Sequence, residues 1–295
     1  MDVGEILEMQ AREIKKLRMD VDQLRRQETP VVSLENAFLL AQDGRIGAAE
    51  TQLAQLSPTA LALAAYHAAP LLFPNLRAVW LMNQWAPGLV YDATSQGRHM
   101  TTHGTLAFNQ QNTILRYLGL DGSSTYLSRV SEAGLEITNS LSVMAWAYKG
   151  TSGTQFIMLA KTSGLPASTN QAFFFTVGAS NNLNLTVCNG TTNYNQTIAA
   201  PIGEWFFGAG SYSPSADITL YLGTQDGWQA ASNTTGIPAS INNPTTIDLT
   251  IGATHGGANF GDGRIAMAAL MNSGSNETLF RNYFEFTKGL FYGFN

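Results

Sequence analysis

Residues 141–147 read LSVMAWA, and this stretch decides the fold class of the chain. Leu141 and Val143 alternate with Ser142, Met144 and Trp146 at a period of two. Successive side chains of a β-strand point to opposite faces, so this period predicts a strand rather than a helix. The same alternation returns at residues 218–222 and 265–269. The chain is therefore expected to be mainly β.

Further strand-like runs surround this stretch. They lie at residues 114–120, 125–130, 155–161, 172–177, 183–188, 205–209 and 246–251. Turns rich in Gly, Asn and Ser separate them at intervals typical of an all-β sandwich. About ten strands over about 220 residues fit one large antiparallel two-sheet domain. Strands and helices do not alternate along the chain, which argues against a parallel sheet.

Several motifs occur in the order of a known fold family. Residues 91–99 (YDATSQGRH), 118–127 (LGLDGSSTYL) and 141–147 resemble the opening loop, strand pair and following strand of laminin-G-like, concanavalin-A-like jelly rolls. Later matches follow at residues 203–205, 218–222, 250–252 and 260–265, and residues 275–286 correspond to the closing helix. The resemblance covers residues 76–295. It implies a two-sheet antiparallel jelly roll of the lectin and glucanase type.

The same resemblance implies a calcium site, and the sequence departs from the pattern there. Thr125 stands where the family has a second acidic residue, and residues 266–268 read AMA in place of an acidic motif. Asp92, Asp121 and Asp262 remain as calcium candidates, because hard cations need several oxygen ligands. The alternative role for these residues is hydrogen bonding within turns, which we favour. We expect no other cofactor.

The carboxylates do not form a glycosidase pattern. Glycosidases need two carboxyl groups on either side of the scissile bond, and jelly-roll enzymes carry them as Glu-x-Asp-x-x-Glu on one strand. Here Glu132 and Glu136 lie in a predicted loop, and Glu204 is isolated. Neither a Gly-x-Ser-x-Gly nucleophile elbow nor a phosphate-binding loop occurs. The sequence therefore predicts a protein that is not an enzyme.

A binding role fits the aromatic residues better. Tyr194, Tyr212 and Trp228 lie in or beside predicted loops rich in Asn, Ser and Thr. Exposed aromatic rings in such a setting can stack on sugars while polar neighbours bind the hydroxyl groups. In the competing interpretation the same rings belong to the core or to a subunit interface. Trp146 and Trp205 are expected in the core.

The first 28 residues differ from the rest of the chain. They hold seven of its 21 acidic and six of its 16 basic side chains. An apolar seam with one polar position repeats every 3.5 residues on average: Val3, Leu7, Gln10, Ile14, Leu17, Val21 and Leu24. This heptad pattern predicts a coiled coil, and pairs such as Glu13 with Arg18 suit contacts between chains. A single amphipathic helix lying on its own domain is the alternative.

A short region connects this stalk to the β domain. Residues 29–75 are rich in Ala, Leu and Gln, with predicted helices over 34–42, from Ile46 to Leu56, and from Pro58 to Pro70. Ser57 precedes Pro58, the usual order of a helix cap and a first helical residue. We expect a stalk at 1–28, a helical collar or plain linker at 29–75, and a jelly roll at 76–295.

Charge, apolar content and cysteine content limit the compartment and the partners that we expect for the chain. The chain opens without an apolar signal segment and has no apolar run of about 20 residues for a bilayer. A net charge of −5 argues against nucleic acid as a partner. Cys188 is the single cysteine, so an internal disulfide is excluded, and its strand-like setting predicts a buried thiol.

A charged coiled coil, a helical connection and a lectin-like jelly roll together resemble bacteriophage fibre, spike or capsid-decoration proteins. This resemblance implies a virion protein made in the host cytoplasm, with other virion proteins and a cell-surface glycan as partners. The apolar seam mildly favours two strands, but such fibres are often trimeric, so we expect a homotrimer. A free lectin and, less favoured, a glycosidase are the alternatives.

Overall fold

A computed structural model describes residues 58–73, 75–86, 88–110, 115–164, 170–274 and 277–293. The predicted coiled coil at 1–28, with all seven of its seam residues, lies outside these ranges. The predicted helices at 34–42 and from Ile46 to Leu56 lie outside them as well.

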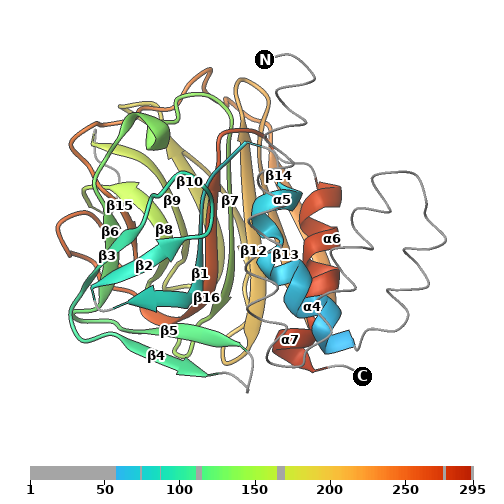
Figure 1. Ribbon diagram of the computed structural model, residues 1–295. Coiled ribbons are helices and arrows are strands. Elements are labelled where there is room, and N and C mark those ends of the chain that lie inside the picture. Colours follow the sequence, from blue (N-terminus) through green and yellow to red (C-terminus); the bar gives the residue numbers. More distant parts are fainter. Residues whose placement is uncertain are drawn as a thin grey trace, which may run out of the picture.

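The described chain is a mainly β, antiparallel sandwich, as the sequence predicts (Figure 1). The front sheet runs in the order β11 (Asn193–Ala199), β10 (Asn182–Cys188), β9 (Gln171–Val177), β8 (Phe156–Thr162), β15 (Leu249–Ile251), β6 (Tyr126–Arg129), β3 (Met100–His103) and β2 (Leu89–Asp92). The back sheet continues through β1 (Leu76–Ala86), β16 (Asp262–Met271), β7 (Leu141–Tyr148), β12 (Trp205–Ser213), β13 (Asp217–Thr224) and β14 (Gly227–Asn233). In addition, β5 (Arg116–Asp121) pairs with β16 and with β4 (Ala107–Gln110).

The central strands of the back sheet, β16, β7, β12 and β13, are buried on both of their faces. Along β7, Val143 and Ala145 join the first hydrophobic core, which lies between the two sheets. Met144 and Trp146 point the other way, into a second core beneath a layer of helices. Trp146 is fully buried, as predicted, and stacks on Phe291 with ring centroids 3.8 Å apart. The side chains on both faces of residues 141–147 are thus mostly apolar because each face packs into a core of its own.

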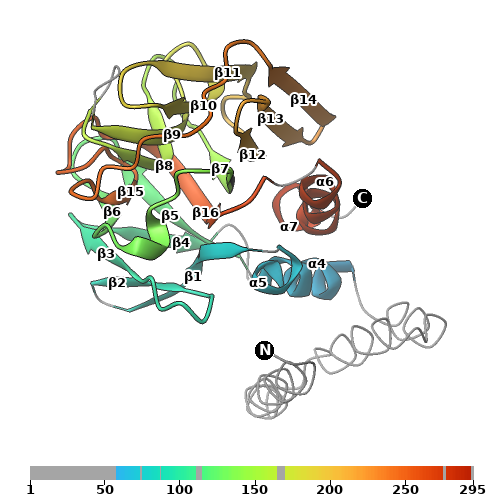
Figure 2. The same ribbon diagram turned by 90° about the horizontal axis from the view of Figure 1, so that it is seen from above.

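Among the described residues, four helices form the layer that covers the back sheet, and Figure 2 shows them side by side. They are α4 (Pro58–His67), α5 (Ala69–Leu72), α6 (Glu277–Thr287) and α7 (Gly289–Tyr292). The predicted helix that starts at Pro58 is thus present as α4 and α5, and the predicted closing helix is α6. No helix among the described residues is long and apolar enough to span a bilayer.

Buried tyrosines fix α4 to the sheet and to α6. The Tyr66 hydroxyl donates a hydrogen bond to the carbonyl oxygen of Ala266 in β16. The Tyr283 hydroxyl in α6 donates to the carbonyl oxygen of Tyr66 over 3.2 Å. Burial, and then the neighbouring Tyr283, raise the pKa of Tyr66 well above its ordinary value, so this phenol remains a donor. Strand β1 begins at Leu76, but residues 58–73 share the second core. A collar around a stalk remains a prediction.

The edge strands β11 and β14 were missing from the sequence prediction, which placed loops there. Their sequences, NYNQTIA and GWQAASN, are polar, and many of their side chains are exposed. The two edges of the sandwich meet where the Asn233 side-chain amide donates to the carbonyl oxygen of Asn195 over 3.0 Å. Polar edge strands lack the apolar alternation that identifies a strand in a sequence, and polar character at an edge discourages pairing with other chains.

Truncating Tyr66 tests whether α4 belongs to the folded domain. Tyr66→Ala should lower the free energy of unfolding by about 3–5 kcal/mol, because it opens a cavity in the second core. Leu71→Ala is the control, since Leu71 lies in the same helical layer with 63% of its surface exposed, and should change stability by less than about 0.5 kcal/mol. Urea unfolding followed by tryptophan fluorescence measures both. Equal stabilities for the two variants would contradict the packing described.

Candidate functional site

The three aromatic residues predicted to bind a ligand lie on strands rather than in loops. Tyr212 in β12 is fully buried, and its hydroxyl donates to the Pro238 carbonyl oxygen over 2.7 Å. The prediction for Tyr212 is therefore wrong, because neither face of its ring is open. Trp228 in β14 is half-buried against Phe207 and donates to Glu277 Oε1 over 3.0 Å. Tyr194 in β11 is half-buried against the first core.

In two of the three calcium candidates, the carboxylate oxygens already accept several hydrogen bonds. Asp92 accepts from the backbone N–H groups of Val79, Thr94 and Arg98 and from the Thr94 hydroxyl, over 2.7–3.0 Å. Asp121 accepts in the same way from residues 123–125. Burial opposes the charge of Asp121, but these hydrogen bonds outweigh it and hold its pKa well below the usual range. This is the turn-bonding role favoured from the sequence.

The third candidate, Asp262, pairs across the strands with Asp121 and accepts from the Thr151 hydroxyl over 2.7 Å. Asp92 lies apart from this pair, on β2. Within the described part of the chain, no group of three or more His, Cys, Asp or Glu residues is arranged to hold a metal ion. The structure therefore offers no calcium site built from the three predicted residues together.

The outer face of the front sheet carries a different cluster, which we call the outer strip. Its side chains all point outward and belong to β2, β3 and β6 or to residues next to them. They are those of Leu89, Tyr91, His99, Thr101, His103, Tyr126, Ser128 and Val130. The strand register places Leu89 opposite Thr101, Thr101 opposite Ser128, and His103 opposite Tyr126. The alternating neighbours Val90, Met100 and Leu127 are fully buried in the first core. Because successive side chains of a strand point to opposite faces, all members of the strip point outward.

The strip combines aromatic faces with hydrogen-bonding groups. The rings of His103 and Tyr126 are stacked 4.1 Å apart and nearly parallel, and Tyr91 packs edge-on against His99 at 5.1 Å. His103 Nε2 and the Ser128 hydroxyl are 2.8 Å apart. Phe260 extends the aromatic group beside Tyr126.

The strip also carries exposed apolar surface. Among the described residues, five large apolar side chains are exposed: Leu71, Leu89, Tyr91, Val130 and Phe286. Three of the five belong to the strip, where Val130 reaches 70% exposure and Tyr91 reaches 37%. A gathering of exposed apolar side chains rimmed by polar groups is typical of a binding surface.

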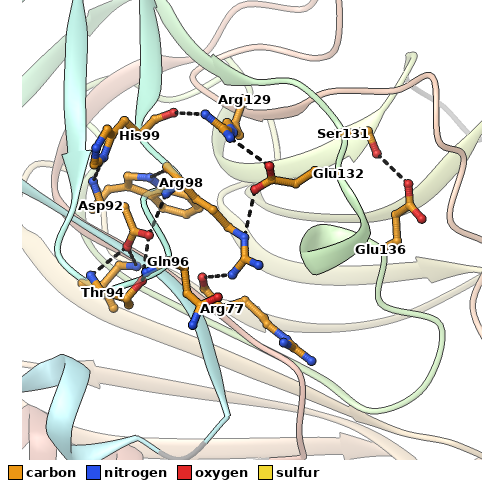
Figure 3. Close-up of polar contacts among 12 residues, drawn as sticks. Arg77, Asp92, Thr94, Gln96, Arg98, His99, Arg129, Ser131, Glu132 and Glu136 are labelled. Carbon is orange, nitrogen blue, oxygen red and sulfur yellow. Dashed lines mark hydrogen bonds and ion pairs between the residues drawn. The ribbon is translucent and has the colours of Figure 1, made fainter. Parts of the chain in front are cut away.

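A partly buried polar network holds the loop between β2 and β3 beneath the strip (Figure 3). Glu132 accepts from Arg98 Nε over 2.9 Å and from Arg129 Nη2 over 2.8 Å. Arg98 also donates to the Arg77 carbonyl oxygen, and the Trp80 indole N–H donates to the carbonyl oxygen of Arg98. One carboxylate thus ties the loop that carries His99 to the segment that carries Val130.

The charges of the network favour its ionised form. Burial alone would raise the pKa of Glu132, but the hydrogen bonds and positive charges of Arg129 and Arg98 outweigh it and lower that pKa. Space is tight as well, because a Cβ added at Gly134 would lie 1.7 Å from Arg98 Nη2. The absence of a side chain at residue 134 lets the guanidinium reach its place.

A family model described as the concanavalin A-like lectin/glucanases superfamily matches residues 121–276, more than half of the chain. The chain belongs to this family. The comparison with curated proteins found no match.

Solved structures with the same fold include receptor-binding domains of botulinum neurotoxins. The binding domain of neurotoxin DC, solved in complex with rat synaptotagmin II, is 12% identical, with a TM-score of 0.54, and the alignment covers 74% of this chain and 52% of that one. The receptor-binding domain of the C/D mosaic serotype is 11% identical, with a TM-score of 0.55, over 71% of this chain and 51% of that one. The chain thus spans about half the length of these domains, and at such identity the likeness establishes the fold alone.

Sequence reasoning missed both the outer strip and the network beneath it. It considered Glu132 and Glu136 only in rejecting a glycosidase pattern, and it used residues 91–99 only for the family resemblance and for Asp92 as a calcium candidate. The outward direction of Leu89 and Tyr91 could have been predicted from the sequence, because the apolar Val90 lies between them and should point into the core. The pairing of Arg98 with Glu132 spans 34 positions, and only the folded chain brings these residues together.

Glu132→Gln should lower the free energy of unfolding at pH 7 by about 1–2 kcal/mol, because it removes the charge that two arginines share, with allowance for partial solvent exposure. The folded-state pKa lies below the ordinary 4.5. The contribution is therefore complete above pH 4.5 and disappears as the pH falls through the folded-state pKa. Urea unfolding at pH 7 and in acid measures it, with Glu204→Gln as the control. A pH-independent difference would contradict the ion-pair account.

Proposed function

We propose that this protein is a non-enzymatic binding module that recognises surface glycans through the outer strip. The observation that carries the proposal is the gathering of Tyr91, Tyr126 and His103 with hydroxyl groups on one outward sheet face. Aromatic faces stack on the apolar faces of sugar rings, while hydroxyl and imidazole groups bind sugar hydroxyls. The family of the chain supports this choice.

A glycosidase fits the carboxylates less well. Both oxygens of Glu132 accept from arginines, which keep it ionised and unable to act as a general acid near neutral pH. Retention of sugar configuration would need a second carboxyl group about 5–5.5 Å away on the other side of the bond. A protein surface remains the second candidate ligand, since the strip also exposes Leu89 and Val130.

We further propose that the module is a homotrimeric component of a bacteriophage virion, a fibre, spike or capsid decoration made in the host cytoplasm. The heptads of residues 1–28 support oligomerisation, and the separation of a charged helix from a weakly charged β domain supports anchoring at one end. Neighbouring virion proteins would then hold the N-terminal region. The sandwich would face outward.

Tyr91→Ala should weaken glycan binding at least about tenfold, because one exposed ring carries a large share of the contact in a small interface. A glycan array with calcium present identifies a ligand, and titration calorimetry compares the variants. Phe286→Ala is the matched control, since Phe286 is 63% exposed on the helical layer, and should bind like the unchanged protein. Equal loss in both variants, or an array without signal, would contradict the glycan proposal.

The mass in solution tests oligomerisation. Light scattering should find three copies of the 31.8 kDa chain, and Leu17→Asp should dissociate them, because a charge in the seam opposes coiled-coil packing. A shortened chain that starts at residue 58 retains α4 and should be monomeric. Equal masses for all three proteins would remove the proposed role of the stalk.

A further inference from the structure

The back sheet carries a second group of aromatic rings, at the edge of the helical layer. The strand register places Trp205 of β12 beside Tyr148 of β7. It places Arg264 of β16 between Tyr148 and Gly119 of β5. Trp205 is buried against Phe291 of α7, with ring centroids 5.2 Å apart, whereas Tyr148 and Arg264 are half-buried. This row of residues therefore runs from beneath the helices to a partly open part of the sheet.

Arg264 contacts aromatic faces rather than an acid. Its guanidinium carbon lies 4.4 Å from the ring centroid of Tyr148 and 5.1 Å from that of Tyr117 in β5. In the described part of the chain, no ion pair or hydrogen bond engages this guanidinium. Asp262, on the same strand, accepts from the Thr151 hydroxyl instead. A guanidinium that lies over aromatic rings keeps its N–H edge free for a planar anion.

The sheet leaves room for a ligand beside Arg264. Gly119 has no side chain, and a Cβ added there would lie at an ordinary contact distance, 3.5 Å from Asn109 Nδ2. Asn109 of β4 is exposed and lies directly opposite Tyr117. An anion bound at Arg264 is therefore accompanied by a phenol ring and a side-chain amide. These are groups that bind the faces and hydroxyls of sugars.

We propose that Arg264 binds the carboxylate of a uronic acid in an acidic polysaccharide, with the sugar ring over Gly119 and beside Tyr117. Two N–H groups of the guanidinium donate to the two carboxylate oxygens, and such bidentate pairs are strong and directional. The inference rests on the proposed function only in that its ligand is a glycan. The site lies on the back sheet, apart from the outer strip, so either site can fail without the other.

A galacturonic acid tetramer and its methyl ester test the site on the full chain by titration calorimetry. The ester lacks the charge, so the unchanged protein should bind it at least about tenfold more weakly than the acid. Arg264→Gln should weaken binding of the acid by a similar factor, and Arg264→Lys at least about threefold, because lysine lacks the planar fork. Gly119→Val should also weaken binding, by filling the floor of the site. Arg281→Gln, at an exposed arginine of α6, is the control and should bind like the unchanged protein.

Further comparisons separate the possible outcomes. Asp262→Asn removes a negative charge from the same strand and should leave binding of the acid equal or tighter. Thermal unfolding shows which variants are folded, and if Arg264→Gln is not, the comparison of acid with ester on the unchanged protein decides. Equal affinity for acid and ester, or no binding of the acid, would overturn the proposal. Loss of binding in Tyr91→Ala with retention in Arg264→Gln would also overturn it, because the tetramer would then occupy the outer strip.

Discussion

The back sheet must be covered on both faces, and the rest of the structure depends on this constraint. Met144 and Trp146 project from β7 opposite to Val143 and Ala145, so neither face tolerates water. Full burial of one such side chain contributes about 1.5–3 kcal/mol, and the sheet presents many of them. Helices α4 and α5 precede the sandwich in the sequence, and helices α6 and α7 follow it. The two pairs meet over this face and complete the second core.

The outer face of the front sheet is left without such a cover, and it is there that we propose the ligand binds. There the outward members of β2, β3 and β6 are aromatic, polar or exposed, while the side chains between them fill the first core. Such a face can be open and still be ordered, because the Arg98–Glu132–Arg129 network fixes its loop from below. Rigid support beneath an exposed contact surface reduces the entropy lost on binding.

Much of the sandwich could be predicted from the sequence, because apolar side chains alternate along β7, β13 and β16 and the family motifs follow in order. The polar edge strands β11 and β14 could not be, since nothing in NYNQTIA separates a strand from a loop. The site was harder still. Tyr212 looked available in a stretch rich in serine, yet pairing with β7 and β13 buries it. The outer strip contains residues from three strands, and no local sequence pattern predicts which strands will be neighbours in the sheet.

The helical layer closes one side of the sandwich, and we propose that the outer strip on the other side binds the ligand. Hydrogen–deuterium exchange of the free and ligand-bound protein tests both halves together. Amides of β7 and β16 should exchange most slowly, α4 should be protected with them, and added protection on binding should be confined to β2, β3 and β6. Rapid exchange throughout α4, or new protection over α5 and α6 in place of the strip, would contradict the account.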